Sequence, residues 1–161
     1  MRMQSHANLC GPAALANAFR TVGKTHVTED KVAKAIKVAA SAVEAPEQDG
    51  AGVRSLQRAA EAFGYALTPW TFAAFEQAWA YTLYSVGRGQ PCLLAVDSGQ
   101  TDEGHWITAI GTVGDSLLVA DPAESEIVEP VTARALDTRW KDGSGSYYLL
   151  ALAYVPKRRK K

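Results

Sequence analysis

Residues 8–23 read NLCGPAALANAFRTVG, and this stretch decides the fold. Apolar side chains recur at helical spacing after Pro12, and Gly23 is a natural stop, so we predict a helix over residues 12–22. Cys10 lies directly ahead of this helix. Unpaired backbone amides and the helix dipole give positive potential there, which favours a thiolate. Cys10 is therefore a candidate nucleophile.

Helical patterns continue through the first half of the chain. A second helix is predicted to begin near Thr28, a good N-cap, and to run through residues 31–43. Residues 44–52, EAPEQDGAG, break this pattern and are predicted to form a loop. Two more amphipathic helices are expected over residues 53–63 and 72–86. The first half is therefore predicted to be mainly helical.

The second half changes character from Gln90 onward, where short β-branched and apolar runs alternate with Gly, Asp, Ser and Pro. The runs are PCLLAVD (91–97), HWITAIGTV (105–113), SLLVADP (116–122), SEIVEPV (125–131) and SYYLLALAYV (146–155). They predict an antiparallel sheet. Strands that follow helices indicate an α+β fold with segregated layers and not an alternating parallel α/β fold.

Length and composition limit the number of domains that the chain can form. A chain of 161 residues, 47% of them hydrophobic, can bury one substantial core. We predict a single domain over residues 1–156 and a basic tail, KRRKK, at 157–161. The tail is interpreted as a solvated end, with a contact to nucleic acid or anionic lipid as the alternative.

Charge and hydropathy argue against several partners. Seventeen basic and seventeen acidic residues give no net field, so nucleic-acid binding is not expected. No signal-peptide pattern is present, and no apolar run approaches the roughly 18–20 residues that a membrane-spanning helix needs. We expect a soluble cytoplasmic protein without a membrane span, and no pattern specifies an oligomeric state.

Three histidines could serve Cys10 as a base. His26 lies between two predicted helices, beside charged residues, and is interpreted as a surface loop residue. His6 is close enough to Cys10 to line the site, although it fits the segment leading into the helix better. His105 opens a predicted strand beside a polar loop, where a side chain is held rigidly and can still reach a cleft. We therefore favour His105.

Asp121 and Gln4 complete a candidate site. Asp121 ends the strand after that of His105, and a short turn between the two strands would bring both residues together. Its carboxylate can then orient the imidazole, although taken alone it could merely cap the turn at Pro122. Gln4 precedes Cys10 and can donate to an oxyanion alongside the Cys10 backbone N–H, although alone it could be a surface amide.

The remaining candidates concern substrate binding and the second thiol. Gly11 lets backbone approach a substrate closely, His6 could line the site, and Trp106 could form a cleft wall or pack in the core. Cys92 lies in an apolar run and is interpreted as a small buried hydrophobe. A zinc site on Cys10 is disfavoured because no CxxC or HxxxH pair exists. We expect no metal and no cofactor.

Several motifs carry a resemblance to a known family. QSHANLCGPAAL (4–15), GHWITAIG (104–111) and VADPA (119–123) are similar to motifs of papain-like cysteine peptidases of the bacteriocin-processing type, which form the N-terminal domain of peptide exporters. The likeness extends to DGAGVRSLQRAAEAFGY (49–65), QPCLLAVD (90–97) and VTARALDTRWKDG (131–143). It implies a papain-like fold with an N-terminal helical lobe and a C-terminal antiparallel sheet lobe.

The same resemblance implies a role for each candidate residue. Cys10 would be the nucleophile, His105 the general base and acid, Asp121 the group that orients the histidine, and Gln4 the oxyanion donor. Family members cut leader peptides after two small residues, commonly glycines, and need no metal. A cysteine peptidase acting on peptide or isopeptide bonds is therefore expected, with a peptide or protein as substrate.

Two other kinds of function fit the same residues. A papain-like fold kept as a non-catalytic peptide-binding module is disfavoured by the intact Cys10, His105 and Asp121. An amidase or an acyltransferase would use the same triad, and the sequence does not distinguish them from a peptidase.

Overall fold

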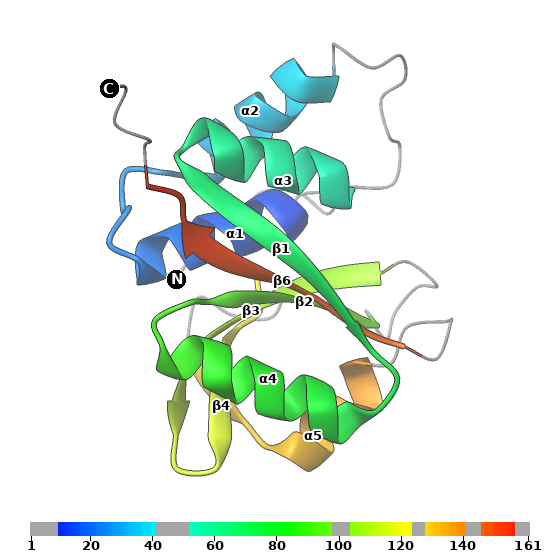
Figure 1. Ribbon diagram of the computed structural model, residues 1–161. Coiled ribbons are helices and arrows are strands. Elements are labelled where there is room, and N and C mark those ends of the chain that lie inside the picture. The colour runs from blue at the N-terminus through cyan, green and yellow to red at the C-terminus, as the bar shows by residue number, and fades with distance from the viewer. Residues whose placement is uncertain (1–9, 41–51, 98–103, 124–127, 141–145, 157–161) are drawn as a thin grey trace.

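One antiparallel sheet organises the protein (Figure 1). The computed structural model describes residues 10–40, 52–97, 104–123, 128–140 and 146–156. In chain order these contain α1 (Cys10–Thr21), α2 (Glu29–Ala40), α3 (Val53–Ala62), β1 (Tyr65–Phe72), α4 (Phe75–Gly87), β2 (Cys92–Asp97), β3 (Gly104–Val113), β4 (Ser116–Ala120), β5 (Val128–Val131), α5 (Ala133–Trp140) and β6 (Tyr147–Tyr154). Within these residues the strands lie in the order β1-β6-β2-β3-β4-β5.

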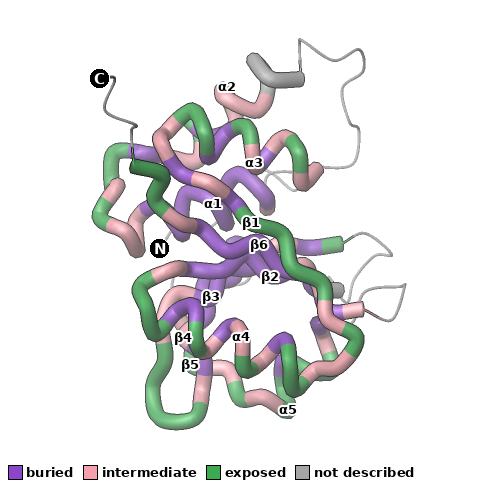
Figure 2. Tube along the Cα trace, in the orientation of Figure 1, coloured by how far each residue is buried: buried purple, intermediate pink, exposed green. Residues whose placement is uncertain are grey.

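Helices cover both faces of this sheet. One hydrophobic cluster joins α1, α2 and α3 to Leu93 of β2 and Leu150 of β6. The other joins α4 and α5 to the residues that alternate with these along the same strands, such as Cys92 and Leu94 of β2 and Leu149 and Ala151 of β6. Successive residues of a strand point to opposite faces, so the central strands are apolar on both sides. Figure 2 accordingly shows burial concentrated in the central strands and α1.

The helix that begins at Cys10 is held firmly in this structure. Residues 11–19 of α1 are all buried, and the Phe19 ring makes edge contacts at 5.4 Å between centroids with both Phe63 and Tyr65. The helix ends at Thr21, and the turn after it contains Gly23, whose φ of 79° suits glycine. The Lys24 N–H donates to the Phe19 carbonyl at 2.8 Å. Cys10, the first residue of α1, is therefore held by a firmly packed helix.

The predicted α+β class with an antiparallel sheet is confirmed, and so are the principal helices and strands. Cys10 is the first residue of α1 and not a residue ahead of it. The part of the predicted 44–52 loop that precedes residue 52 lies outside the described residues, as does the predicted tail at 157–161. The single domain over 1–156 stays a prediction. No helix in the described ranges combines the length and apolar character that crossing a membrane requires.

The prediction of a mainly helical first half missed a strand. Tyr65–Phe72 forms β1, which pairs along its whole length with β6 at the edge of the sheet, and α4 begins at Phe75 instead of residue 72. Pro69 removes one donor from this strand, which an edge position tolerates. Most of its C-terminal half is exposed, so the alternation that marks a strand is weak there.

A short helix in the second half was also missed. The eight residues of α5 lie between two strands, and Leu136 and Trp140, one helical turn apart, are its buried anchors. The Trp140 indole N–H donates to the Tyr148 carbonyl of β6 at 3.1 Å. This contact fixes the end of α5 beside the sheet, and so fixes the position of Arg139.

Candidate active site

A β-bulge in the pairing of β3 with β4 governs which residues share a face of the sheet. Near the turn Val113 pairs with Ser116, but Thr108 pairs with Ala120, so the register has shifted by one residue. The shift falls between Ala109 and Gly111. An extra residue in one strand of an antiparallel pair re-aims every side chain beyond it.

The shifted register decides where Asp121 points. Continued without the bulge, the pairing would set Asp121 opposite Thr108, on the face that α1 covers. With the bulge, the next position after Ala120 lies opposite Ile107, and residues that are opposite or two apart share a face. Asp121 therefore lies on the same face as His105.

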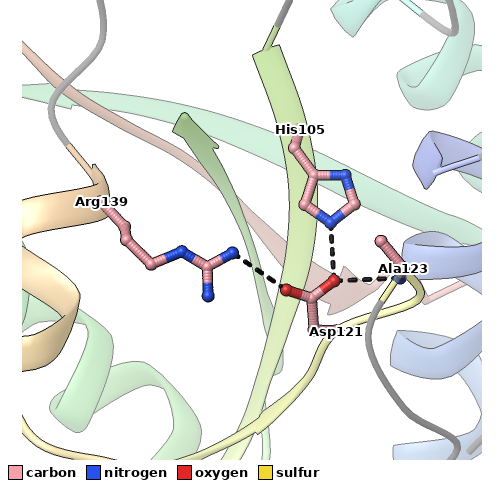
Figure 3. A network of polar contacts seen from close by, with 4 residues as sticks. All are labelled: His105, Asp121, Ala123 and Arg139. Atoms are coloured by element: carbon pink, nitrogen blue, oxygen red, sulfur yellow. Dashed lines mark hydrogen bonds and ion pairs between the residues drawn. The ribbon is translucent and has the colours of Figure 1, made fainter. Parts of the chain in front are cut away.

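The two side chains meet directly. His105 Nε2 lies 2.6 Å from Asp121 Oδ1, and both side chains are about nine-tenths buried (Figure 3). The Ala123 backbone N–H donates to the same carboxylate oxygen at 3.0 Å, and Arg139 Nη2 donates to Oδ2 at 3.1 Å. Burial favours the neutral acid, but these donors and the charge of His105 outweigh it and hold the pKa of Asp121 below its ordinary value. Asp121 is therefore an ionised hydrogen-bond acceptor.

Cys10 reaches this pair from the start of α1. Its sulfur is hydrogen-bonded to the His105 side chain and to the backbone of Trp106 and of Gly11. Burial favours the neutral thiol, but these bonds and the charge of His105 outweigh it and lower the pKa of Cys10 from 9.0. The thiol of Cys10 therefore ionises more readily than an ordinary cysteine.

The imidazole is the middle of a three-residue chain. Because Asp121 engages Nε2, the other ring nitrogen, Nδ1, is left for Cys10. Burial disfavours the charged ring, yet the bonds to Asp121 and Cys10 and their negative charges raise the pKa of His105 to about 9. At neutral pH this arrangement favours a thiolate beside an imidazolium, the state in which sulfur is nucleophilic.

Arg139 is the residue at this site that the sequence did not reveal. It reaches Asp121 from α5, with its side chain 37% exposed. Its neighbour Trp140 is fully buried, which fixes the helix from which Arg139 extends. An arginine eighteen residues after an aspartate carries no recognisable spacing signal, and only the prediction of α5 would have pointed to it.

The other candidates are placed as follows. Gln4 and His6 lie outside the described residues. Gly11 is buried in the first turn of α1. The Trp106 ring is half-buried and packs edge-on against Tyr148, with 6.3 Å between centroids, in the cluster beneath α1. A substrate-binding role for Gly11, His6 or Trp106 stays a prediction.

The second thiol lies in a different environment. Cys92 is fully buried in the cluster that faces α4, and both cysteines are free thiols. Burial raises the pKa of Cys92 to about 11, although the neighbouring Ser85 hydroxyl opposes the shift. The interpretation of Cys92 as a buried hydrophobe is confirmed. Within the ranges that the structure describes, no three His, Cys, Asp or Glu residues gather as a metal-binding group would require.

Known structures share this fold. A C39-like peptidase from Bacillus anthracis superposes with a TM-score of 0.66 at 18% identity, covering 99% of this chain and 95% of that chain. The peptidase domain of Streptococcus ComA, a bifunctional ABC transporter involved in quorum sensing, gives 0.65 at 18% identity, covering 97% of each chain. A double-glycine-motif protease from an AMS/PCAT transporter, in complex with the leader peptide, gives 0.65 at 18% identity, covering 94% and 89%.

The fold is thus that of papain-like cysteine peptidases. The chain belongs to the Peptidase_C39 like family, whose sequence pattern matches residues 1–148. No curated protein sequence matches it. The resemblance inferred from the sequence motifs is confirmed, and family and fold together support a cysteine peptidase of the papain-like type.

Proposed function

We propose that this protein hydrolyses peptide bonds with Cys10 as nucleophile, His105 as general base and acid, Asp121 as the group that orients His105, and Gln4 as an oxyanion donor. The observation that carries the proposal is the hydrogen-bonded chain from the Cys10 sulfur through the His105 ring to the Asp121 carboxylate. Nucleophile, base and orienting group in hydrogen-bond reach are the arrangement that acyl transfer requires.

The proposed reaction has two stages. In the first, the Cys10 thiolate attacks the peptide carbonyl carbon, and the His105 imidazolium gives its proton to the departing amine as the C–N bond breaks. This leaves an acyl group joined to Cys10 as a thioester. In the second, neutral His105 takes a proton from water, the hydroxide attacks the thioester, and the C–S bond breaks to release the acid and restore the ion pair.

The tetrahedral intermediate of each stage carries an oxyanion. Backbone N–H groups in the first turn of a helix have no acceptor within that helix, so the Cys10 N–H is suited to this charge. We assign Gln4 as the second donor because its amide lies on the segment that precedes the nucleophile. Asp121 stabilises the imidazolium without taking its proton.

The proposed substrate is a peptide cut after two small residues. Support comes from the AMS/PCAT protease of the same fold, whose structure holds a leader peptide. Isopeptide hydrolysis, amide hydrolysis and acyl transfer use the same three residues and are the alternatives within this chemistry.

A set of synthetic peptides tests the proposal. The peptides differ only in the two residues before the bond to be cut, with Gly-Gly, Gly-Ala and Ala-Ala set against Leu-Leu and Lys-Lys, and mass spectrometry identifies the products. We expect cleavage after the small pairs only. Binding of these peptides without cleavage of any would instead favour the non-catalytic peptide-binding module.

Arg139 provides a further prediction, as a residue that positions Asp121. Replacing Arg139 by glutamine removes the charged donor to Oδ2 and leaves the carboxylate freer to turn away from His105. We expect kcat to fall about tenfold with KM unchanged, because the loss affects the reacting geometry and not substrate contacts. Lysine should restore only part of the rate, since it keeps the charge but not the planar fork of donors.

The matched control is Arg134, an exposed arginine on the same helix. Arg134→Gln removes the same charge from α5 and should leave both kcat and KM unchanged. Equal effects of the two substitutions would refute the assigned role of Arg139.

A further inference from the structure

Thr108 is a fully buried polar residue at the contact between α1, which carries Cys10, and β3, which carries His105. It lies on β3, three residues after His105, with none of its surface exposed. Its hydroxyl donates to the backbone carbonyl of Ala14 on α1 at 2.8 Å. Ala14 itself is one helical turn after Cys10. A valine would fill the same volume in this apolar layer, so the hydroxyl serves the bond to α1.

This bond joins α1 to β3 one helical turn beyond Cys10, which is itself attached to β3. The Cys10 sulfur is hydrogen-bonded to the backbone of Trp106 and to the side chain of His105, both on β3. Trp106 with Cys10 and Thr108 with Ala14 are therefore two successive attachment points. Along β3 the two attachment points are two residues apart, roughly 6.6 Å at the usual rise of a strand. Along α1 they are four residues apart, about 6 Å at the usual rise of a helix. The two spacings match, so the pair of bonds fixes the position of the helix along the strand.

We propose that Thr108 is a positioning residue of the reaction: its hydrogen bond to Ala14 holds α1 in register along β3, so that the Cys10 sulfur stays within hydrogen-bond reach of His105. This inference rests on the proposed function and deepens it. Thr108 acts through α1 and touches neither the substrate nor the reacting atoms.

The hydrogen bond between Thr108 and Ala14 can be removed without leaving a buried polar group unpaired. In an α-helix the Ala14 carbonyl also accepts the N–H of the residue four positions on, Ala18, and a carbonyl oxygen has two lone pairs. Valine at position 108 keeps the volume and the β-branched shape. The apolar cluster of α1 would still hold the helix on the sheet, and the bonds of the Cys10 sulfur would remain, but the directional bond one helical turn further along α1 would be lost. A displacement of about 1 Å between reacting groups can lower a reaction rate strongly while it changes the packing energy only a little.

The chain contains a matched control, Thr82. Its side chain is also fully buried, and its hydroxyl also donates to a backbone carbonyl at 2.8 Å, that of Ala78. Both of these residues belong to α4, so the bond joins nothing to the site. Thr82→Val and Thr108→Val thus remove the same kind of bond at the same burial, and only the second loosens α1 against β3.

The experiment measures the rate at which iodoacetamide alkylates Cys10 at about pH 6, together with kcat and KM for the Gly-Gly peptide and the melting temperature. We expect Thr108→Val to lower the alkylation rate and kcat about tenfold each, with KM unchanged and a melting temperature close to that of Thr82→Val. Thr108→Ser, which restores the hydroxyl, should recover most of both rates. Thr82→Val should leave both rates unchanged.

The other possible results would refute either the role of Thr108 or the proposed function itself. Equal rates in Thr108→Val and the unaltered protein, or equal losses in Thr108→Val and Thr108→Ser, would refute the role of Thr108 while leaving the proposed function intact. A comparable rate loss in Thr82→Val would show a general effect of stability and refute it too. If Cys10 of the unaltered protein reacts as an ordinary thiol at this pH, the proposed function itself fails, and the role of Thr108 with it.

Discussion

Replacing Cys10 by alanine is expected to lower the rate of peptide cleavage by a factor on the order of 10⁵ while the protein stays folded. The substitution removes the sulfur that forms the thioester, and no other described thiol can replace it because Cys92 is sealed in the core. Residues 11–19 remain buried, and His105 keeps its bond to Asp121. Cleavage of the Gly-Gly peptide and the circular dichroism spectrum measure the two effects.

Cys92→Ala is the matched control for this prediction. It makes the same chemical change at a fully buried position, so it should cost stability through the small cavity that it leaves, by about 1–2 kcal/mol, and should preserve cleavage. Cleavage that survives in Cys10→Ala would contradict the nucleophile assignment.

Replacing His105 by glutamine is expected to lower cleavage by a factor of about 10⁴. The variant lacks both the base that activates water and the acid that protonates the departing amine. The fold should tolerate the change, because Asp121 keeps its bonds to Ala123 and Arg139 and so is not left as an unpaired buried charge. The kcat for the Gly-Gly peptide and the free energy of unfolding in urea test both statements.

The control for this variant is His26, which is exposed in the turn between α1 and α2. His26→Gln should leave both kcat and stability unchanged. If His105→Gln retained more than a hundredth of the original kcat, the assignment of His105 as base and acid would be wrong.

Local patterns in the sequence predicted the elements that carry the site. Apolar spacing and Gly23 identified α1, and short β-branched and apolar runs bounded by Gly, Asp, Ser and Pro identified β3 and β4. The expected proximity of His105 and Asp121 is what the structure has, at 2.6 Å. These features follow from short-range rules of helix ends and strand pairing, so a single sequence contains them.

Features set by contacts between distant segments could not be predicted. The register shift between Ala109 and Gly111 puts Asp121 on the face of His105, and no sequence signal marks it, since the stretch AIG suits a regular strand equally well. Arg139 depends on α5, whose eight residues are too few to show a clear period. Thr108 is typical of any strand until its partner on α1 is known.

The central claim is that Cys10 and His105 form an ion pair near neutral pH. The pH dependence of Cys10 alkylation by iodoacetamide tests this claim most directly. Mass spectrometry distinguishes alkylation of Cys10 from alkylation of Cys92. A depressed thiol pKa and an imidazole pKa of about 9 predict that Cys10 reacts faster below pH 9 than an ordinary thiol does and that this excess reactivity disappears in His105→Gln. Cys92 should stay inert in the folded protein. A Cys10 rate that rises only near pH 9, as for an unperturbed thiol, and that is the same in His105→Gln would contradict the account.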